Sequence, residues 1–324
     1  MNHSATPWLE RHQIGLYLAA LAVGALIAGA APAAGRATAP LLTPVLATLL
    51  YATFVQVPVR ELTHSLRNKR FLTAALFLNF AVVPLVVAGM WFFLPHHDTI
   101  RVGVLLVLLT PCIDYVIAFT QLAGGASRTL LAATPLLLLA QMLLLPVFLW
   151  LFLGPDATTM IHVGPFATAF VTLIAAPLAL AWVTQTWAGR HRSGRAVTNS
   201  AQRCAVPLMA ATLAIVVASQ TPKLDGAVHL AVTVAPFFVV FLTVMAIIGW
   251  AAARTLKLDP AAGRALIFTG ATRNSLVVLP LALALPDALS AAAIVVVTQT
   301  VVEIVGMIVY IAVVPKMMPT SASG

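Results

Sequence analysis

The segment that decides the fold runs from Arg128 to Leu153 and reads RTLLAATPLLLLAQMLLLPVFLWLFL. Arg128, at its start, is its only charged residue, and most of the remaining side chains are apolar. A transmembrane α-helix needs about 20 predominantly apolar residues, and this segment is longer than that. The segment is therefore predicted to cross a lipid bilayer as a helix.

The composition extends this prediction to the whole chain. Of the 324 residues, 61% are hydrophobic and only 8% are Asp, Glu, Lys or Arg, whereas about 25% of the residues of a soluble globular protein are charged. So few charges cannot cover a water-facing surface, which excludes a soluble enzyme. The sequence also lacks the alternation of transmembrane strands, and helices satisfy their own backbone in lipid. We expect an all-α, polytopic membrane protein.

Polar breaks divide the chain into ten apolar stretches. They cover roughly residues 13–34, 40–59, 71–94, 101–122, 128–153, 164–188, 202–220, 228–252, 261–285 and 289–314. Ten spans divide into two sets of five, and because five is odd the second set has inverted topology. We therefore expect one integral membrane domain made of two inverted five-helix repeats, residues 1–158 and 159–324. Secondary transporters commonly have this design.

The cationic residues are distributed unequally between the two sides of this arrangement. With the N-terminus inside, three of them lie outside, Arg273 lies within a span, and fourteen lie on the cytoplasmic side. The fourteen are Arg11, Arg60, Arg67, Lys69, Arg70, Arg128, Arg190, Arg192, Arg195, Arg203, Arg254, Lys257, Arg264 and Lys316. The positive-inside rule thus predicts a multi-pass plasma-membrane protein with both termini in the cytoplasm. The same loops explain the net charge of +9 without a nucleic-acid partner.

Two of the spans are predicted to be interrupted. The fourth reads LTPCIDY at residues 109–115, and the ninth reads FTGATRNS at residues 268–275, with Pro111 and Gly270 as the expected break points. Proline removes an internal hydrogen bond, and such a break persists at membrane depth only where protein or a water-filled cavity satisfies the backbone. The two spans are counterparts in the inverted repeats, so broken helices at both places predict a binding site.

Three ionisable residues lie deep within spans: Asp114, Arg273 and Glu303. Each charge costs at least about 2.5 kcal/mol at the bilayer centre, so we expect Asp114 to pair with Arg273 where the broken spans meet. Glu303 is then left to carry a proton, with Asp114 as a second proton-coupling candidate. Two plainer interpretations stay open: the pair only braces the helices, or Glu303 is simply hydrogen-bonded to a hydroxyl such as that of Thr300.

Candidate substrate contacts surround the same breaks. Cys112 follows Pro111 and is either a soft buried core residue or a ligand for a thiophilic species. Arg273, Asn274 and Ser275 are expected to line the substrate site from the ninth span. The two cysteines lack the spacing of a thiolate metal site, and no Walker A motif occurs. We therefore predict no bound metal, no cofactor and no ATPase subunit.

Several motifs along nearly the whole chain resemble the arsenite efflux permeases of the bile acid:sodium symporter superfamily. They are LERHQ at 9–13, LYATFVQVP at 50–58, NKRFL at 68–72, LNFAVVP at 78–84, PC at 111–112, FT at 268–269 and VEIV at 302–305. The resemblance implies crossed, broken helices four and nine in a core domain, and a panel domain of helices one, two, six and seven. It also implies export of trivalent arsenic, and sometimes antimony, driven by protons, with Cys112 as metalloid ligand and Glu303 as the matching acid.

The chain departs from that family pattern at several positions. Leu276 stands where the permeases have a glutamate, Arg273 replaces one asparagine of a pair, and Asp114 replaces a small residue. Sodium-coupled relatives have a Ser-Asn pair on the fourth span, where this chain has Val116 and Ile117. Hard cations prefer oxygen ligands, so sodium coupling at those positions is disfavoured. The charge of Arg273 either stands in for a sodium ion or recognises an anion.

The leading hypothesis is a proton-coupled secondary transporter, not an enzyme, that exports arsenite-like metalloids across the lipid bilayer. The first alternative is a sodium- or proton-coupled transporter of a small organic anion, in which Arg273 meets a carboxylate or sulfonate. The second alternative is a membrane protein without transport activity, such as a receptor or an assembly partner. The cargo under either transport hypothesis is a small inorganic or organic solute.

Overall fold

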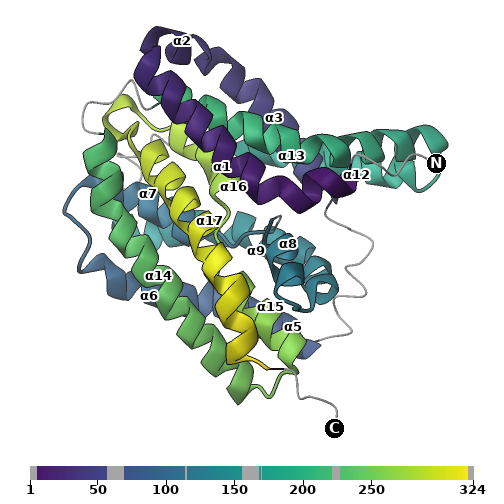
Figure 1. Cartoon of the computed structure of the whole chain (residues 1–324). Coiled ribbons are helices and arrows are strands. Elements are labelled where there is room, and N and C mark those ends of the chain that lie inside the picture. Colours follow the sequence, from purple (N-terminus) through teal and green to yellow (C-terminus); the bar gives the residue numbers. More distant parts are fainter. Residues whose placement is uncertain are drawn as a thin grey trace. The chain divides into compact units, whose positions relative to one another are not determined.

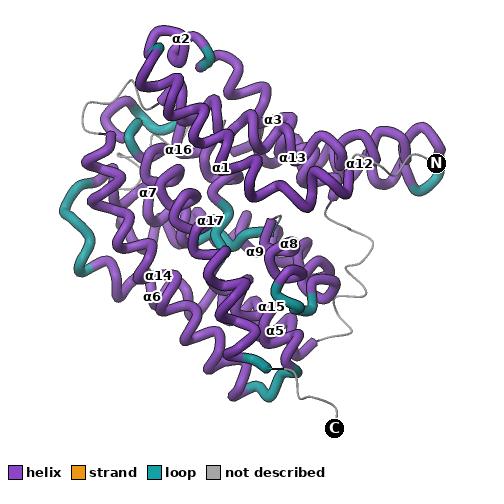
Figure 2. The backbone as a smooth tube through the Cα atoms, in the orientation of Figure 1, coloured by secondary structure: helices purple, strands orange, loops and turns teal. Residues whose placement is uncertain are grey.

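The computed structural model in Figure 1 describes residues 6–56, 69–113, 115–154, 168, 170–220 and 227–319. Within these residues every regular element is a helix, as Figure 2 shows, and extended backbone pairs only in one isolated bridge. The all-α fold class is therefore confirmed for the part of the chain that is described. The chain divides into two compact units.

The first unit is formed by residues 1–57, 163–230 and 279–285. Its helices are α1 (Thr6–Ala30), α2 (Pro32–Ala37), α3 (Ala39–Gln56), the π-helix η4 (Val171–Ala175), α12 (Ala176–Ala188) and α13 (Arg192–Gln220). Helix α13 packs along both α1 and α3 (Figure 1). A Cβ atom added to Gly24 would lie 2.7 Å from the carbonyl oxygen of Ala214. The absence of that side chain lets α1 approach α13 closely.

The second unit is formed by residues 58–162, 231–278 and 286–324. Its elements are α5 (Lys69–Phe77), η2 (Leu78–Val82), α6 (Val83–Trp91), α7 (Asp98–Leu108), α8 (Tyr115–Leu122), α9 (Ser127–Leu153), most of α14 (Ala227–Thr255), α15 (Pro260–Ala271), the start of α16 (Ser275–Leu283), η6 (Asp287–Leu289) and α17 (Ala292–Met317). Helices α14 and α17 lie side by side in Figure 1. Tyr310 donates from α17 to the carbonyl oxygen of Leu242, and Trp250 Nε1 donates from α14 to that of Met317.

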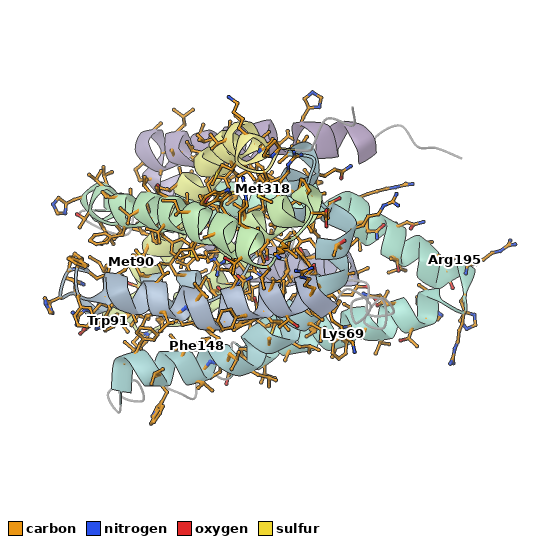
Figure 3. The ribbon with its side chains drawn as sticks, turned by 90° about the horizontal axis from the view of Figure 1, so that it is seen from below. Lys69, Met90, Trp91, Phe148, Arg195 and Met318 are labelled. Carbon is orange, nitrogen blue, oxygen red and sulfur yellow. The ribbon has the colours of Figure 1, made fainter. Side chains whose placement is uncertain are left out.

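Helices α5, η2 and α6 form one continuous rod, with Lys69 and Trp91 at its opposite ends in Figure 3. The middle of the rod is a π-helical turn in which the N–H of Val83 donates to the carbonyl oxygen of Leu78. Pro84 follows this turn and has no N–H of its own, which favours the wider turn. Such turns often occur at functional sites, and here the turn carries Asn79, which is fully buried.

The lengths and surfaces of the helices fit a lipid environment. Among the residues that the structure describes, five helices are long and apolar enough to cross a membrane: Lys69–Trp91, Ser127–Leu153, Arg192–Ser219, Val228–Thr255 and Ala292–Met317. Large apolar side chains point outward on these helices, including Leu143 at 74% and Val232 at 67% exposed. Polar side chains such as Gln141, Gln299 and Glu303 are buried instead. This arrangement supports a multi-pass membrane protein.

Each of the ten predicted stretches overlaps a helix or a pair of helices in the described residues. The ten-span arrangement as two inverted repeats nevertheless stays a prediction, because within the described part of the chain five helices meet the length and hydropathy requirement. The predicted halves, residues 1–158 and 159–324, also stay a prediction. Each compact unit takes segments from both halves, and compactness does not report on chain duplication.

Close packing of α7 on α17 depends on Gly103. A Cβ atom at this position would lie 2.7 Å from Cβ of Val295, a β-branched neighbour that cannot rotate that atom away. We expect Gly103→Ala to lower the free energy of unfolding by about 1–3 kcal/mol. Gly89→Ala on α6 is the matched control, since a Cβ there meets nothing within 4 Å. Thermal unfolding in detergent compares the two, and equal melting temperatures would contradict this packing.

Candidate functional site

The break between α7 and α8 follows from two adjacent residues. The hydroxyl of Thr110 donates to the carbonyl oxygens of Leu106, at 3.0 Å, and Val107, at 3.1 Å, which completes the last turn of α7. Pro111 has no N–H and disfavours the helical conformation of the residue before it. Helix α7 therefore ends at Leu108, and the next helix, α8, starts at Tyr115.

The break between α15 and α16 has a similar local cause. The hydroxyl of Thr272 donates to the carbonyl oxygen of Phe268 at 2.9 Å, and Thr272 itself has extended backbone angles. Asn274 then starts α16, because its Oδ1 accepts from the N–H of Val277 at 3.2 Å, a typical N-terminal cap. Gly270, the expected break point, lies in the last turn of α15, just before the break.

The two breaks lie against each other as short antiparallel segments. Pro111 and Arg273 form the isolated bridge. The N–H of Cys112 donates to the carbonyl oxygen of Thr272 at 3.1 Å, and the N–H of Asn274 donates to that of Thr110 at 2.8 Å. These bonds satisfy backbone groups that a broken helix leaves without partners in a membrane. We call this region, residues 109–113 and 272–274, the crossing.

The guanidinium of Arg273 is fully buried at the crossing. Its Nη1 donates to the carbonyl oxygen of Leu108 at 3.2 Å, and its Nη2 donates to Asn79 Oδ1 at 2.8 Å and to the carbonyl oxygens of Thr269 at 3.0 Å and Gly270 at 2.6 Å. The last carbonyls of a helix have no intrahelical partner and carry partial negative charge. One guanidinium therefore caps the C-terminal ends of both α7 and α15.

The carboxylate of Glu303, on α17, accepts three hydrogen bonds beside the crossing. Its Oε1 accepts from the hydroxyl of Tyr115 at 2.7 Å, and its Oε2 accepts from the backbone N–H of Arg273 at 2.7 Å and from Nε2 of Gln299. Thr300, the partner considered from the sequence, donates to a backbone carbonyl one turn earlier instead. Glu303 thus ties α17 to both breaks through groups other than the expected hydroxyl.

The expected pair between Asp114 and Arg273 involves a residue that lies outside the described part of the chain, so it stays a prediction. The described hydrogen-bond partners of the Arg273 guanidinium are neutral oxygens, and its central carbon lies 5.4 Å from the centre of the Phe241 ring. Glu303 approaches the main chain of Arg273.

Several buried polar atoms near the crossing have no hydrogen-bond partner among the described protein atoms. They are Asn274 Nδ2, Ser275 Oγ, Gln299 Oε1 and Arg273 Nε. Buried polar side-chain atoms are normally hydrogen-bonded, and an exception requires an explanation. Cys112, fully buried, lies on the other strand of the same crossing. The arrangement can therefore offer a thiol, hydrogen-bond donors and acceptors to a small polar solute.

Sequence reasoning did not select two of the residues that complete this cluster. Tyr115 is the first residue after the break of the fourth span, but nothing in its spacing indicates that its hydroxyl reaches α17. Asn79 was recognisable only as a polar residue within a span, five residues before Pro84. The proline-linked π-turn that positions Asn79 is the one signal that could have found it.

Comparison with known families supports the transport hypothesis at a coarse level. Residues 43–226 match the model of the Sodium Bile acid symporter family. The chain belongs to this family. Members of the sodium bile acid symporter family are transporters and not enzymes, and transport of a small solute across a membrane is consistent with this match. A comparison with curated proteins gives no match.

On α8, two apolar residues occupy positions where the resemblance to sodium-coupled relatives leads us to expect sodium ligands. Val116 and Ile117 stand where sodium-coupled relatives are expected to have a Ser-Asn pair. Val116 is fully buried and Ile117 is half-buried, both on α8. Neither side chain has an oxygen, so this position offers only backbone oxygens to a hard cation.

Proposed function

We propose that the chain is a proton-coupled secondary transporter that exports trivalent arsenic or antimony. The observation that supports this most directly is the crossing, where the break that carries Cys112 is hydrogen-bonded to the break that carries Asn274. Asn274 Nδ2, within the crossing, and Ser275 Oγ, on the next residue, have no hydrogen-bond partner among the described atoms. Soft sulfur ligands prefer soft, thiophilic species, and interrupted helices are typical of transporter binding sites.

Arsenous acid suits this set of groups because it is a small neutral molecule with three hydroxyls. Asn274 Nδ2 can donate to it, Gln299 Oε1 can accept from it, and Ser275 Oγ can do either. Exchange with the thiol of Cys112 forms one As–S bond and breaks one As–O bond. The departing hydroxide and the thiol proton leave together as water, so no oxidant or reductant is needed.

Coupling to protons is proposed to run through Glu303 and Tyr115. The hydroxyl of Tyr115 lies 2.7 Å from Glu303 Oε1 and 3.2 Å from the carbonyl oxygen of Arg273. It donates to the carboxylate when Glu303 is ionised. When Glu303 takes a proton on Oε1, that proton is donated to the Tyr115 oxygen, and the hydroxyl turns to the Arg273 carbonyl. Protonation on α17 thereby changes the hydrogen bonding of the crossing itself.

Removing the hydroxyl of Tyr115 tests this switch. We expect Tyr115→Phe to lower pH-gradient-driven transport by about tenfold or more, because a hydrogen bond to a charged group is worth about 1.5–3 kcal/mol. Tyr310→Phe is the matched control: it loses a buried hydroxyl whose hydrogen bond goes to the carbonyl oxygen of Leu242 and not to the carboxylate of Glu303. Flux into proteoliposomes at equal protein content measures both. Equal losses in the two variants would contradict a specific role for Tyr115.

A second candidate is coupled transport of a small organic anion, which the family match favours. In that case Arg273 would meet the carboxylate or sulfonate of the solute. The four hydrogen bonds from Arg273 to protein oxygens leave its Nε as the donor without a partner among the described atoms. This engagement of the guanidinium is why we place the neutral metalloid first.

Counterflow in proteoliposomes distinguishes these functions. Proteoliposomes that contain the purified protein are loaded with arsenite, antimonite or one of a panel of small organic acids. Exchange is measured with and without an imposed pH gradient. Exchange of arsenite that the pH gradient drives is the expected result. Exchange of organic acids alone would favour the second candidate, and no exchange of any solute would favour a membrane protein without transport activity.

The charge distribution supports the proposed orientation, with both termini in the cytoplasm of a plasma-membrane protein. Arg195 lies at an exposed end of the long helix pair α12–α13 in Figure 3, within the cluster of cationic residues that is expected to face the cytoplasm. Labelling of an Arg195→Cys variant in intact cells and in inverted vesicles tests this orientation. Reaction only in inverted vesicles is expected.

A further inference from the structure

Four neutral oxygens surround the guanidinium of Arg273. Three are backbone carbonyls at the ends of broken helices, from Leu108, Thr269 and Gly270, and the fourth is Asn79 Oδ1 on the π-turn. They come from three different elements, η2, α7 and α15, and lie 2.6–3.2 Å from the guanidinium nitrogens. The protein has therefore gathered four oxygens around one buried positive charge.

Such a set of oxygens is the kind that binds a small monovalent cation. Carbonyl oxygens can replace the hydration shell of an ion, and unwound backbone and half-helix C-terminal ends coordinate sodium ions or protons in transporters. The helix dipoles add to this effect, because the C-terminal ends of α7 and α15 both carry partial negative charge toward Arg273. Here the positive charge is covalently attached to the chain and cannot dissociate.

We propose that the Arg273 guanidinium is a built-in cation that occupies a monovalent-cation site at the crossing. The wild-type protein then needs no dissociable sodium ion at this position, and removal of the side chain opens a site for a small free cation. The inference rests on the proposed transport function, because it concerns the ion that is coupled to transport. Its central test uses binding and stability, which do not depend on the identity of the cargo.

Arg264, on α15, provides a comparison with Arg273. Among the described residues its guanidinium donates to backbone carbonyls alone, those of Met318, Ala123 and Gly124. Those carbonyls lie just beyond the ends of α8 and α17, away from both breaks. Arg264 thus braces helix ends, and its removal should destabilise the protein without creating any sodium dependence of transport.

The experiment compares purified wild type, Arg273→Ala and Arg264→Ala in choline chloride, with millimolar sodium or guanidinium chloride replacing choline at constant ionic strength. We expect the melting temperature of Arg273→Ala to fall in choline and to rise saturably by about 3 °C or more with guanidinium or sodium. Arg195→Ala, at an exposed position, reports non-specific salt effects. Wild-type stability and transport should be the same in sodium and in choline.

Two outcomes would overturn the proposal. One is a wild type that is stabilised saturably by sodium or loses transport without it. The other is an Arg273→Ala variant that responds to cations no more than Arg195→Ala does. If Arg273→Ala does not fold in any salt, Arg273→Lys decides, because lysine keeps the fixed charge and should stay insensitive to sodium. A sodium-stabilised lysine variant would contradict the built-in cation, whatever solute the protein transports.

Discussion

Cells that express the Cys112→Ser variant are expected to lose arsenite resistance. The arsenite flux of the purified variant is expected to be about tenfold lower than that of wild type, or lower still. The physical reason is that a serine hydroxyl is a hard oxygen ligand and does not replace a thiol toward a soft, thiophilic solute. Serine is nearly the same size as cysteine, so the backbone bond from residue 112 to Thr272 should persist. Resistance in growing cells and flux in proteoliposomes measure the effect.

Cys204→Ser is the matched control for this prediction. Cys204 lies exposed on α13, in the first compact unit, whereas Cys112 is fully buried at the crossing of the second. We expect Cys204→Ser to transport arsenite like wild type at the same protein level. Undiminished resistance in Cys112→Ser, or an equal loss in the two variants, would remove the proposed role of the thiol.

Glu303→Gln is expected to abolish the dependence of arsenite flux on an imposed pH gradient and to reduce the flux close to that of empty liposomes. Glutamine cannot exchange a proton at this position. Its amide nitrogen also adds donors where three donors already converge, from Tyr115, Gln299 and the backbone of Arg273. With that nitrogen toward Tyr115, the hydroxyl of Tyr115 is expected to turn to the carbonyl oxygen of Arg273, so the variant stays in the arrangement proposed for protonated Glu303.

Asp98→Asn is the control for Glu303→Gln, because Asp98 is an exposed acid in the first turn of α7. It should keep its response to the pH gradient. Arsenite binding is measured in parallel, to separate loss of coupling from loss of the fold. A Glu303→Gln variant that still responds to the gradient as wild type does would show that the coupling proton binds elsewhere.

Much of the helical framework could be predicted from the sequence, because apolar stretches of membrane length have few other structures open to them. The stretch 128–153 corresponds closely to α9, Ser127–Leu153, and 228–252 to α14, Ala227–Thr255. The prediction for the third span missed its π-helical turn at Leu78–Val82, because this turn is a local response to Pro84 that hydropathy does not detect. The inverted repeat rests on span parity and stays a prediction.

The sequence indicates where the two helix breaks of the candidate site lie in the chain, but it does not indicate which hydrogen bonds form there. Proline and consecutive polar residues within apolar spans indicated both breaks, and the structure brings them together through Cys112 and Asn274. The sequence does not reveal which oxygens a buried cation will contact, because three of the four around Arg273 are backbone carbonyls, which every residue type has. The role of Tyr115 likewise depends on how α8 and α17 pack together.

The most direct test of the central claim is X-ray absorption at the arsenic edge on purified protein with bound arsenite. It reports which atoms surround the arsenic. If the crossing is the substrate site, wild type and Cys204→Ser should show one sulfur neighbour with the remaining neighbours oxygen, and Cys112→Ser should show oxygen alone or no bound arsenic. A sulfur signal that persists in Cys112→Ser, or wild-type protein that binds no arsenite, would contradict the proposed site.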